Sequence, residues 1–498
     1  MSANKPTQPN ANALYYGDNL DVLREYIKDE SVDLIYLDPP FNSARDYNVL
    51  FASPKGEQSE AQIVAFKDTW HWGEQAEREL FEIMHGQNTD AALMIEAFRQ
   101  FLGKNDMLAY LVMMTNRLLE LHRVLKPTGS LYLHCDPTAS HYLRILLDCI
   151  LGKENFRNEV YWHYYNKMHD YRKKLFPRAT DTILFYTKCV GTDFSFQLLK
   201  ELRDEPVRQL VRKKVDNKMV NARDEHGKLL YQVKEDRTLD NVWRIPMLQP
   251  ASPERLGYPT QKPLALLERI VNASSNEGDV VLDPFCGCGT AVHAAQKLKR
   301  QWIGIDITHL AITLIEKRLK DAFPEIRFDV HGTPKDLEGA RDLANRDKYQ
   351  FQWWACSLVN AQPYQGKKKG ADGGIDGLIF FQDDTDAHKK IIVSVKGGEK
   401  LDVRMIRELA QVVTREKAEI GLFVTLTQPT GPMVKEAVGE GYYTSPVTGK
   451  NFRKLQILTI AGLLNGNEKA EYPDFSYGAT TFKKARVEAK TGKQGDMF

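Results

Sequence analysis

Short apolar runs alternate with amphipathic stretches through the first two thirds of this 498-residue chain. The runs have the length of buried strands, and the stretches between them carry apolar residues at the three- and four-residue spacing of a helix. This alternation predicts an α/β fold with a mostly parallel, doubly wound sheet. The predicted strands are residues 32–37, 131–135, 182–186, 280–282 and 302–305, and the predicted helices are residues 108–125, 263–272 and 307–319.

A second alternation begins after about Gly332 and indicates a further domain. It contains a predicted helix over residues 334–364 and predicted strands at 391–395, 422–425 and 455–460. A segment with weak periodicity and many charges interrupts the first alternation. We predict a larger domain over residues 1–332 with an insertion at about 190–255, a smaller α/β domain over 333–482, and a disordered basic tail over 483–498.

The composition is that of a globular protein. Apolar residues make up 42% of the chain, and no apolar run is long enough to span a bilayer. The first residues contain no apolar signal core, and six cysteines are too few for a disulfide framework, so we expect a reduced, cytoplasmic protein with no membrane partner. Cys286 and Cys288 have the spacing of metal ligands, but no second pair stands nearby, and we predict no metal in the larger domain. The net charge of +2 neither favours nor excludes nucleic acid.

The first predicted strand ends abruptly in Asp38-Pro39-Pro40-Phe41. Proline cannot donate to a sheet, so a simple turn after the strand would explain this tetrapeptide. The alternative is a rigid corner in which a carboxylate and an aromatic face hold one flat, polar ligand. The tetrapeptide alone does not separate the two interpretations.

A loop with two glycines follows the predicted strand at residues 280–282, which ends at Asp283. Gly287 and Gly289 let the backbone approach a ligand, and Thr290 begins a helix. The next strand reaches Asp306 about 20 residues after the glycines, where an acid commonly binds ribose hydroxyls. No further phosphate-binding pattern follows, so the loop predicts a nucleoside ligand without phosphates, although a structural turn has the same glycines.

The two motifs together closely resemble the beta class of S-adenosylmethionine-dependent DNA amino-methyltransferases. The resemblance covers about residues 14–327 and includes "YYGDNLDVL" and "GYPTQKPLALLERIV". The base-binding corner precedes the cofactor loop, which is the circularly permuted order of this class. The resemblance implies a Rossmann-like domain that transfers a methyl group from S-adenosylmethionine to an exocyclic amino group of a base flipped out of duplex DNA.

By this resemblance, Asp38, Pro39, Pro40 and Phe41 hold the target base. An aromatic amine is a weak nucleophile, and two acceptors, the Asp38 carboxylate and the Pro39 carbonyl, would direct its lone pair at the methyl group. The implied cofactor-binding residues are Asp18, Thr260, Gln261, Lys262, Pro263, Asp283, Phe285, Gly287, Gly289, Thr290 and Asp306. Asp18 also fits a plain helix cap. The Asp at the head of the corner favours adenine, and cytosine N4 is the alternative.

The insertion at about 190–255 is the predicted target-recognition region. The segment before it combines aromatic residues with Arg172, Lys173, Lys174 and Arg178, a mixture that suits phosphate contacts and base stacking. A solvated face without a ligand has the same composition. Trp70 and Trp72 come after the corner in the sequence. We expect them either to pack in the core, to flank DNA or to close a homodimer.

The second domain places Asp376 before one predicted strand and Lys396 at the end of the next. Residues 349–466, with "GADGGID" and "SVKGG", resemble the Mrr-type restriction endonucleases, whose PD-(D/E)xK fold uses acids to hold magnesium and a lysine to polarise water. Ser394 stands where that pattern has an acid or glutamine, and a hydroxyl is a weak magnesium ligand. The domain is therefore either a magnesium-dependent nuclease that uses Asp376, Asp372 and Lys396, or a DNA-binding or structural relic.

Two hypotheses remain at this point. The first is a DNA adenine methyltransferase whose C-terminal domain assists DNA binding or restriction. The second is a bifunctional restriction–modification nuclease in which the methyltransferase half recognises the site. The intact corner and loop favour the first, because the nuclease pattern is broken at Ser394.

Overall fold

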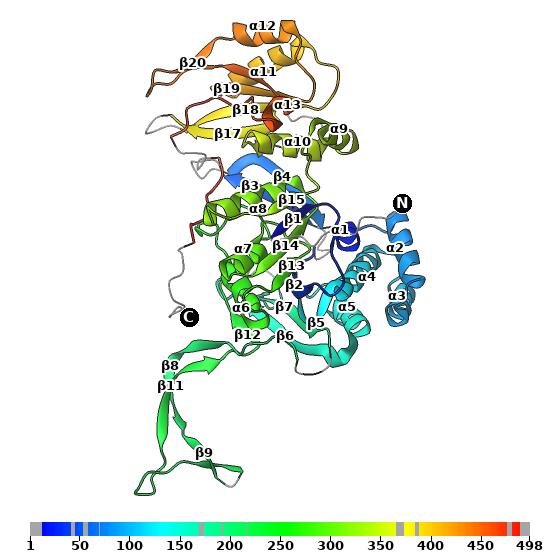
Figure 1. Ribbon diagram of the computed structural model, residues 1–498, viewed down its shortest axis with the longest axis vertical. Helices are drawn as coiled ribbons and strands as arrows, with labels where there is room; N and C mark the ends of the chain where they lie inside the picture. The colour runs from blue at the N-terminus through cyan, green and yellow to red at the C-terminus, as the bar shows by residue number, and fades with distance from the viewer. Residues whose placement is uncertain are drawn as a thin grey trace.

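Two β-sheets form the two main parts of the molecule, and a long two-stranded ribbon projects from the larger part (Figure 1). The structure is a computed structural model that describes residues 12–40, 45–52, 58–68, 70–168, 174–189, 191, 193–215, 217–364, 373–383, 388–475 and 481–488, with the backbone alone between residues 45 and 68. Among these residues, no helix is long and apolar enough to cross a membrane.

The larger sheet has nine strands and confirms the predicted doubly wound α/β fold. In spatial order the strands are β12 (Val242–Arg244), β6 (Phe156–His163), β7 (Thr180–Thr187), β5 (Leu125–Cys135), β2 (Val32–Leu37), β13 (Val280–Asp283), β14 (Gln301–Asp306), β1 (Ala13–Tyr16) and β15 (Asp329–His331). Neighbouring strands are parallel except where β7 is involved. All five strands predicted for this part lie within observed strands.

Helices cover both faces of this sheet. One face carries α1 (Asn19–Tyr26), α2 (Glu74–Met84), α3 (Thr89–Leu102), α4 (Asp106–Val124) and α5 (Ser140–Leu147), and the other carries α6 (Leu264–Ser274), α7 (Thr290–Lys297) and α8 (His309–Ala322). Side chains alternate along β2 as a strand requires. Ile35 and Leu37 join the first core, whereas Leu34 and Tyr36 join the second. Asp38, the next residue, therefore leaves the sheet at its carboxyl edge.

The insertion forms an extended arm rather than a compact unit. Its long ribbon pairs β8 (Lys200–Leu210) with β11 (Tyr231–Thr238), and a second ribbon at the tip pairs β9 (Arg212–Val215) with β10 (Lys218–Asn221). Figure 1 shows the arm projecting away from the large sheet. A separate hairpin, β3 (Arg45–Ala52) and β4 (Gln58–Asp68), follows the corner after β2.

The C-terminal part is built on a mixed five-stranded sheet. Its strands, in spatial order, are β16 (Gln362–Pro363), β17 (Gly377–Gln382), β18 (His388–Lys396), β19 (Ile420–Thr425) and β22 (Leu455–Thr459). The accompanying elements are α11 (Val403–Arg415), α12 (Gly431–Gly439), α13 (Ile460–Leu464), β20 (Tyr442–Thr444) and β21 (Asn451–Arg453).

The single helix predicted over residues 334–364 is wrong in one respect. Two helices occupy this stretch, α9 (Leu337–Arg346) and α10 (Lys348–Leu358). Asp347 lies between them in an extended conformation, and its side chain accepts hydrogen bonds from the first amides of α10. This cap starts a second helix at a point where the continuous periodicity predicted that a single helix would run on.

The tail predicted to be disordered from residue 483 is ordered over its first part. Residues 481–488 lie along the larger part of the molecule, where Lys483 donates to the carbonyl of Ser252 and Glu488 contacts His293. These polar contacts and the partly buried Phe482 give the segment a fixed place that its composition did not indicate. Residues 489–498 lie outside the described part of the chain.

Candidate functional site

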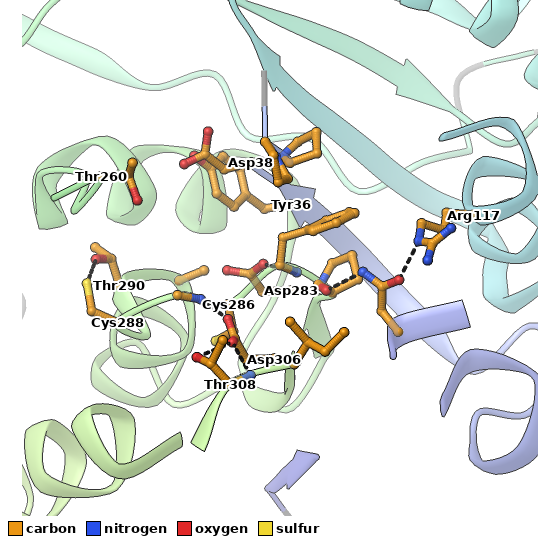
Figure 2. A pocket seen from close by; sticks show the side chains of 18 of the residues that line it. Tyr36, Asp38, Arg117, Thr260, Asp283, Cys286, Cys288, Thr290, Asp306 and Thr308 are labelled. Atoms are coloured by element: carbon orange, nitrogen blue, oxygen red, sulfur yellow. Dashed lines mark hydrogen bonds between the residues drawn. The ribbon is translucent and has the colours of Figure 1, made fainter. Parts of the chain in front are cut away.

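A pocket of about 380 Å³ opens at the carboxyl edge of the large sheet, where β2, β13 and β14 end (Figure 2). Parallel strands of an open α/β sheet bind ligands at this edge. Of the residues predicted to form the site, the pocket is lined by Asp18, Asp38, Pro39, Pro40, Thr260, Gln261, Lys262, Asp283, Phe285, Gly287, Thr290 and Asp306. Gly289 and Pro263 stand beside it as the residues that precede α7 and α6. Phe41 lies outside the described residues.

The carboxylate of Asp38 has two different oxygens. Its Oδ2 accepts a hydrogen bond from Lys262 Nζ, which also donates to the carbonyl of Thr260 at 3.4 Å. Its Oδ1 is buried and has no hydrogen-bond partner among the described residues. Leaving a buried acceptor unpaired costs about 1–3 kcal/mol, so this oxygen is prepared to accept a donor that enters the pocket.

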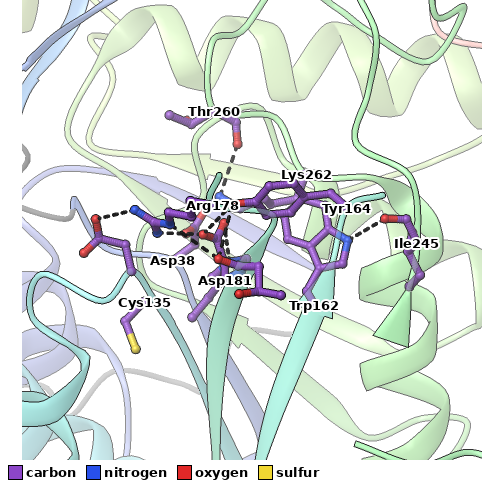
Figure 3. A network of polar contacts seen from close by, with 12 residues as sticks. Asp38, Cys135, Trp162, Tyr164, Arg178, Asp181, Ile245, Thr260 and Lys262 are labelled. Atoms are coloured by element: carbon purple, nitrogen blue, oxygen red, sulfur yellow. Dashed lines mark hydrogen bonds and ion pairs between the residues drawn. The ribbon is translucent and has the colours of Figure 1, made fainter. Parts of the chain in front are cut away.

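A buried polar network lies behind this corner (Figure 3). The hydroxyl of Tyr36 is 3.0 Å from His134 Nδ1, and His134 Nε2 is 3.5 Å from the carboxylate of Asp181. Burial raises the pKa of the Asp181 carboxyl, but hydrogen bonding from His134 and the charges of Lys262 and Arg178 outweigh it, and the pKa lies below its usual range. The network therefore places a fixed negative charge near Lys262.

Arg178, predicted to contact phosphate, is instead part of this network. Its guanidinium donates to Asp181 at 2.7 Å and to Asp136 at 3.2 Å. Both carboxylates hold the guanidinium in place, so its charge is already paired. Arg172 and Lys173 lie outside the described residues, and Lys174 is exposed.

The glycine loop brings backbone close to its neighbours. Gly287 has φ +54°, and a Cβ there would lie 3.2 Å from the ring of Tyr258. Gly289 has φ +76°, and a Cβ there would lie 2.9 Å from Ile315. Both positions combine a left-handed conformation with tight packing, which only glycine satisfies. Glycine at these two positions thus lets Tyr258 and Ile315 pack directly against the loop backbone.

Asp306 holds the glycine loop from the next strand. Its Oδ2 accepts from the amide of Gly287 at 2.8 Å, and its Oδ1 accepts from the amide and hydroxyl of Thr308 at 2.9 and 3.0 Å. Burial raises the pKa of Asp306 to about 6, against these hydrogen bonds. Burial also raises the pKa of the neighbouring Asp283 carboxyl well above its ordinary value. The pocket wall therefore carries two acids that are expensive to ionise.

Asp18 is both a helix cap and a pocket residue. It accepts from the amide of Leu20 at 2.8 Å, and Arg117 Nη2 donates to it at 2.9 Å. Sequence reasoning missed Arg117, whose side chain is 6% exposed and also donates to Asn19. Asn19 in turn donates to the carbonyl of Pro284 and so joins α1 to the glycine loop. An arginine in the apolar pattern of α4 was the signal that could have found it.

Three further aromatic residues line the pocket, Tyr36, Trp70 and Tyr258. Trp70 and Trp72 pack against the core, as one of the predicted alternatives has it. The buried indole Nε1 of Trp70 has no partner among the residues that the structure describes. Tyr258 comes from the "GYPTQKP" segment and closes over Gly287.

Cys286 and Cys288 are buried thiols of the loop. Burial raises the pKa of both thiols, so they resist the deprotonation that metal binding needs. Cys288 Sγ lies 3.8 Å from the hydroxyl of Thr290. Within the described residues, no group of three or more His, Cys, Asp or Glu side chains could hold a metal ion.

The profile of the N6/N4 DNA methylase family matches residues 32–317, which span the corner, the arm and the glycine loop. This chain belongs to that family. It is 29% identical over 342 residues to the type II methyltransferase M.HpaI of Haemophilus parainfluenzae, covering 68% of this chain and 84% of that protein. It is 27% identical over 322 residues to the type II methyltransferase M2.LlaDCHI of Lactococcus lactis subsp. cremoris, covering 63% of this chain and 92% of that protein. The crystal structure of the M1.HpyAVI–SAM complex aligns with a TM-score of 0.34 at 17% identity, covering 62% of this chain and 98% of that one.

The C-terminal part of this DNA methylase carries a second cluster of polar residues. Asp376 is buried, and its Oδ1 accepts from Gln352 Nε2 at 2.7 Å. Its Oδ2 accepts from the amide of Val395 at 2.6 Å and from the hydroxyl of Ser394 at 3.3 Å. Lys396 ends β18, and Asp372 lies outside the described residues.

The restriction endonuclease family Mrr_cat matches residues 343–454 of the methylase, so the predicted resemblance is confirmed. The geometry differs from a magnesium site in one respect. Both oxygens of Asp376 are engaged by protein donors, and one of them, Gln352, belongs to α10. In this arrangement Asp376 links α10 to β18.

Proposed function

We propose that this DNA methylase transfers a methyl group from S-adenosylmethionine to the N6 amino group of adenine in duplex DNA. The observation that carries the proposal is the carboxylate of Asp38. One oxygen is fixed by Lys262, and the other is a buried acceptor without a partner among the described residues, in a pocket that also contains the glycine loop. An amino group that enters the pocket would donate to that oxygen.

The residues at the pocket suit the cofactor. The backbone of Gly287 offers an approach that a Cβ would obstruct, Asp306 would accept from ribose hydroxyls, and Lys262 would face a carboxylate. Phe285, Thr260 and Gln261 would enclose the rest of the S-adenosylmethionine molecule. When bound, S-adenosylmethionine supplies an electrophilic methyl group on a sulfonium centre.

The corner would activate the amine by orientation. Asp38 Oδ1 and the carbonyl of Pro39 would accept the two amino hydrogens, which favours a pyramidal nitrogen with an available lone pair. The amine becomes acidic only after it is methylated, so Asp38 needs no raised basicity to receive the proton. The ion pair with Lys262 holds the carboxylate of Asp38 in one orientation. The base must leave the helix to reach this corner, at a cost of a few kcal/mol.

Adenine is favoured over cytosine by the Asp at the head of the corner, as the resemblance implies. Cytosine N4 uses the same chemistry and is the alternative. The arm would bind the duplex around the target, because its tip carries Arg212, Lys213, Lys214 and Lys218, and none of the four has an ion pair within the described residues. We further propose that residues 1–332 form the methyltransferase domain and that residues 333–482 assist DNA binding.

The test measures which base is methylated. Purified protein is incubated with duplex DNA and isotope-labelled S-adenosylmethionine, and the digested nucleosides are identified by mass spectrometry. N6-methyladenine is expected, and long-read sequencing of the same DNA gives the recognised sequence. N4-methylcytosine would correct the base, and the absence of any labelled nucleoside across diverse DNA would reject the proposal.

The variant Asp38→Ala separates the two halves of the site. Loss of the acceptor should lower the rate of transfer by roughly 10³-fold, as removal of one preorganised catalytic contact does. Cofactor affinity, measured by calorimetry, should stay close to wild type, because Asp38 is assigned to the target base. A variant that no longer binds S-adenosylmethionine would instead assign Asp38 to the cofactor.

A further inference from the structure

The last described segment, residues 481–488, connects the two parts of the molecule; it is called the strap below. Figure 1 shows it running from the C-terminal sheet down the side of the large domain. At its start, the hydroxyl of Thr481 accepts from the amide of Phe380 at 3.0 Å and donates to the carbonyl of the same residue at 2.7 Å. The strap is therefore fastened to β17 before it reaches the methyltransferase side.

The strap then packs behind the glycine loop. Phe482 contacts an apolar cluster made of Tyr258, Cys288, Leu310, Leu314 and Trp353. Tyr258 and Cys288 also line the pocket, and Trp353 comes from α10 of the C-terminal part. One small cluster thus joins the pocket wall, the strap and the nuclease-like domain.

At its end, the strap is held by three polar contacts of Glu488. The amide of Glu488 donates to the carbonyl of Ala322 at 3.0 Å. Its side chain lies 3.0 Å from His293 Nε2 through one oxygen and 3.2 Å from Lys297 Nζ through the other. His293 and Lys297 belong to α7, the helix that begins at the glycine loop.

The contact at His293 continues to the loop through a buried arginine. Arg318 Nε donates to His293 Nδ1 at 3.2 Å, and Arg318 Nη1 donates to the carbonyl of Cys288 at 3.2 Å and to the hydroxyl of Thr290 at 3.0 Å. Arg318 is 3% exposed, so these are among its few possible partners. A continuous chain of hydrogen bonds therefore leads from Glu488 through His293 and Arg318 to the glycine loop.

The chemistry of this series fixes the proton on His293. A guanidinium only donates, so His293 Nδ1 must be the acceptor and the ring hydrogen must lie on Nε2, facing Glu488. Burial and the charge of Arg318 lower the pKa of His293 to about 4 against the opposing effect of Glu488. The ring holds one orientation, because turning it over would put Cδ2–H in the place of Nδ1 and lose the acceptor for Arg318.

We propose that the strap positions the cofactor loop, with Glu488, His293 and Arg318 as positioning residues for S-adenosylmethionine binding. This inference rests on the proposed function of the loop. Through the strap, the nuclease-like domain would support the affinity of the methyltransferase for its cofactor without contacting cofactor or base.

The test uses the full chain and the variant Glu488→Ala. We expect the KM for S-adenosylmethionine to rise about three- to tenfold with kcat within about twofold, since the carboxylate contacts with His293 and Lys297 are lost at a distance from the chemistry. Hydrogen exchange at the amides of residues 287–290 should accelerate. Glu488→Gln keeps an acceptor for His293 and should restore most of the affinity.

The matched control is Arg486→Ala, which removes an exposed charge of the same strap. Its KM and loop exchange should equal those of wild type. If Glu488→Ala changes the melting temperature alone, with KM and loop exchange unchanged, the strap is merely structural and the inference is wrong. If wild type itself binds no S-adenosylmethionine, the proposed function fails and the strap inference fails with it. If wild type binds the cofactor and Glu488→Ala leaves KM and loop exchange unchanged, only the strap inference fails.

Discussion

Asp38 and Asp306 both follow the end of a buried strand, yet their surroundings give them different tasks. Asp38 is paired with an ammonium and keeps one oxygen without a partner among the described residues. Asp306 uses both oxygens to hold the amides of Gly287 and Thr308. The first arrangement leaves a carboxylate ready for a new donor. The second fixes a loop, and an acceptor of ribose hydroxyls there would share oxygens that already have partners.

Cofactor binding should depend on the ionisation of Asp306. Burial raises the pKa of this carboxyl to about 6, so its proton returns as the pH falls through that value. A protonated carboxyl accepts more weakly and loosens the contact with Gly287. We expect the affinity for S-adenosylmethionine to be constant above pH 7 and to fall by up to about tenfold per pH unit below 6. Calorimetry across this range measures it.

The same raised pKa affects folding stability in the opposite direction from cofactor affinity. Because the folded-state pKa of Asp306 is raised, its contribution to stability is full at low pH and is lost as the pH rises through about 6. For cofactor binding, Asp306→Ala should abolish the pH dependence of the affinity for S-adenosylmethionine, because the titrating carboxyl is removed. It should also weaken binding at pH 7, by about 1.5–3 kcal/mol for each charged hydrogen bond lost. Equal affinity in variant and wild type at pH 7 would make Asp306 a structural cap only.

Residues with a sequence signature were predictable, and residues defined by burial were not. The corner and the glycine loop are contiguous, so the chain itself records their spacing. Arg117 of α4 and Arg318 of α8 donate to different residues that line the pocket, and each looked like one charge in a helical pattern. Only the packing of distant segments makes their hydrogen bonds visible.

At the level of elements, the arm is the least self-sufficient part of the molecule. Two-stranded ribbons without a packed face are marginal in water, and most side chains of β8 to β11 are exposed. Near the large domain its charges are paired, for example Lys200 with Asp236 and Arg237 with Glu201. Towards the tip the cations of β9 and β10 have no ion pair among the described residues, which leaves them available to phosphates.

The tip should contribute affinity without sequence preference. Replacing Arg212, Lys213 and Lys214 together by alanine removes up to three phosphate contacts. Binding to duplex DNA should weaken for all sequences, and the slope of log affinity against log salt should fall by up to about 3. The control Lys153→Ala removes an exposed charge from the body of the domain. Fluorescence anisotropy at several salt concentrations measures both, and an unchanged slope in the triple variant would exclude the tip from the interface.

The predicted elements were accurate where strands are buried on both faces. Such strands read as unbroken apolar runs, as in residues 32–37 and 420–425. The missed elements have weaker signals: β1 is short, β6 carries charges, and the arm strands have no buried face. The break at Asp347 was missed because one capping side chain decided it.

At the level of the whole molecule, the nuclease-like domain is better explained as a support than as a cutting enzyme. The resemblance to PD-(D/E)xK nucleases implies an acid that holds magnesium, but here the carboxylate of Asp376 joins β18 to α10 through Gln352. Trp353, the neighbour of Gln352 on α10, packs behind the methyltransferase pocket. The acid that remains of the nuclease pattern thus holds the helix that contacts the other domain.

We therefore expect no magnesium-dependent cleavage by the wild-type protein. Ser394→Glu should not create it, because the neighbouring Asp376 is still engaged by protein donors. Lys396→Ala should lower DNA affinity about equally for all sequences, as loss of a phosphate contact does. Incubation of supercoiled plasmid with magnesium reports nicking directly. Cutting by wild type that disappears in Asp376→Ala would overturn this expectation and restore a working nuclease.

The strand order has a consequence for how the protein is made. β1 lies between β14 and β15, and Ala13 pairs with Ile303, about 290 positions further along the chain. At 5–20 residues per second, a ribosome needs about 15–60 s to supply that partner. Until then β1 has no sheet to join, and β2 exposes the side that β13 will later cover. The corner with Asp38 leaves the ribosome early, but the enzyme can first hold its cofactor only after the middle of the sheet has closed.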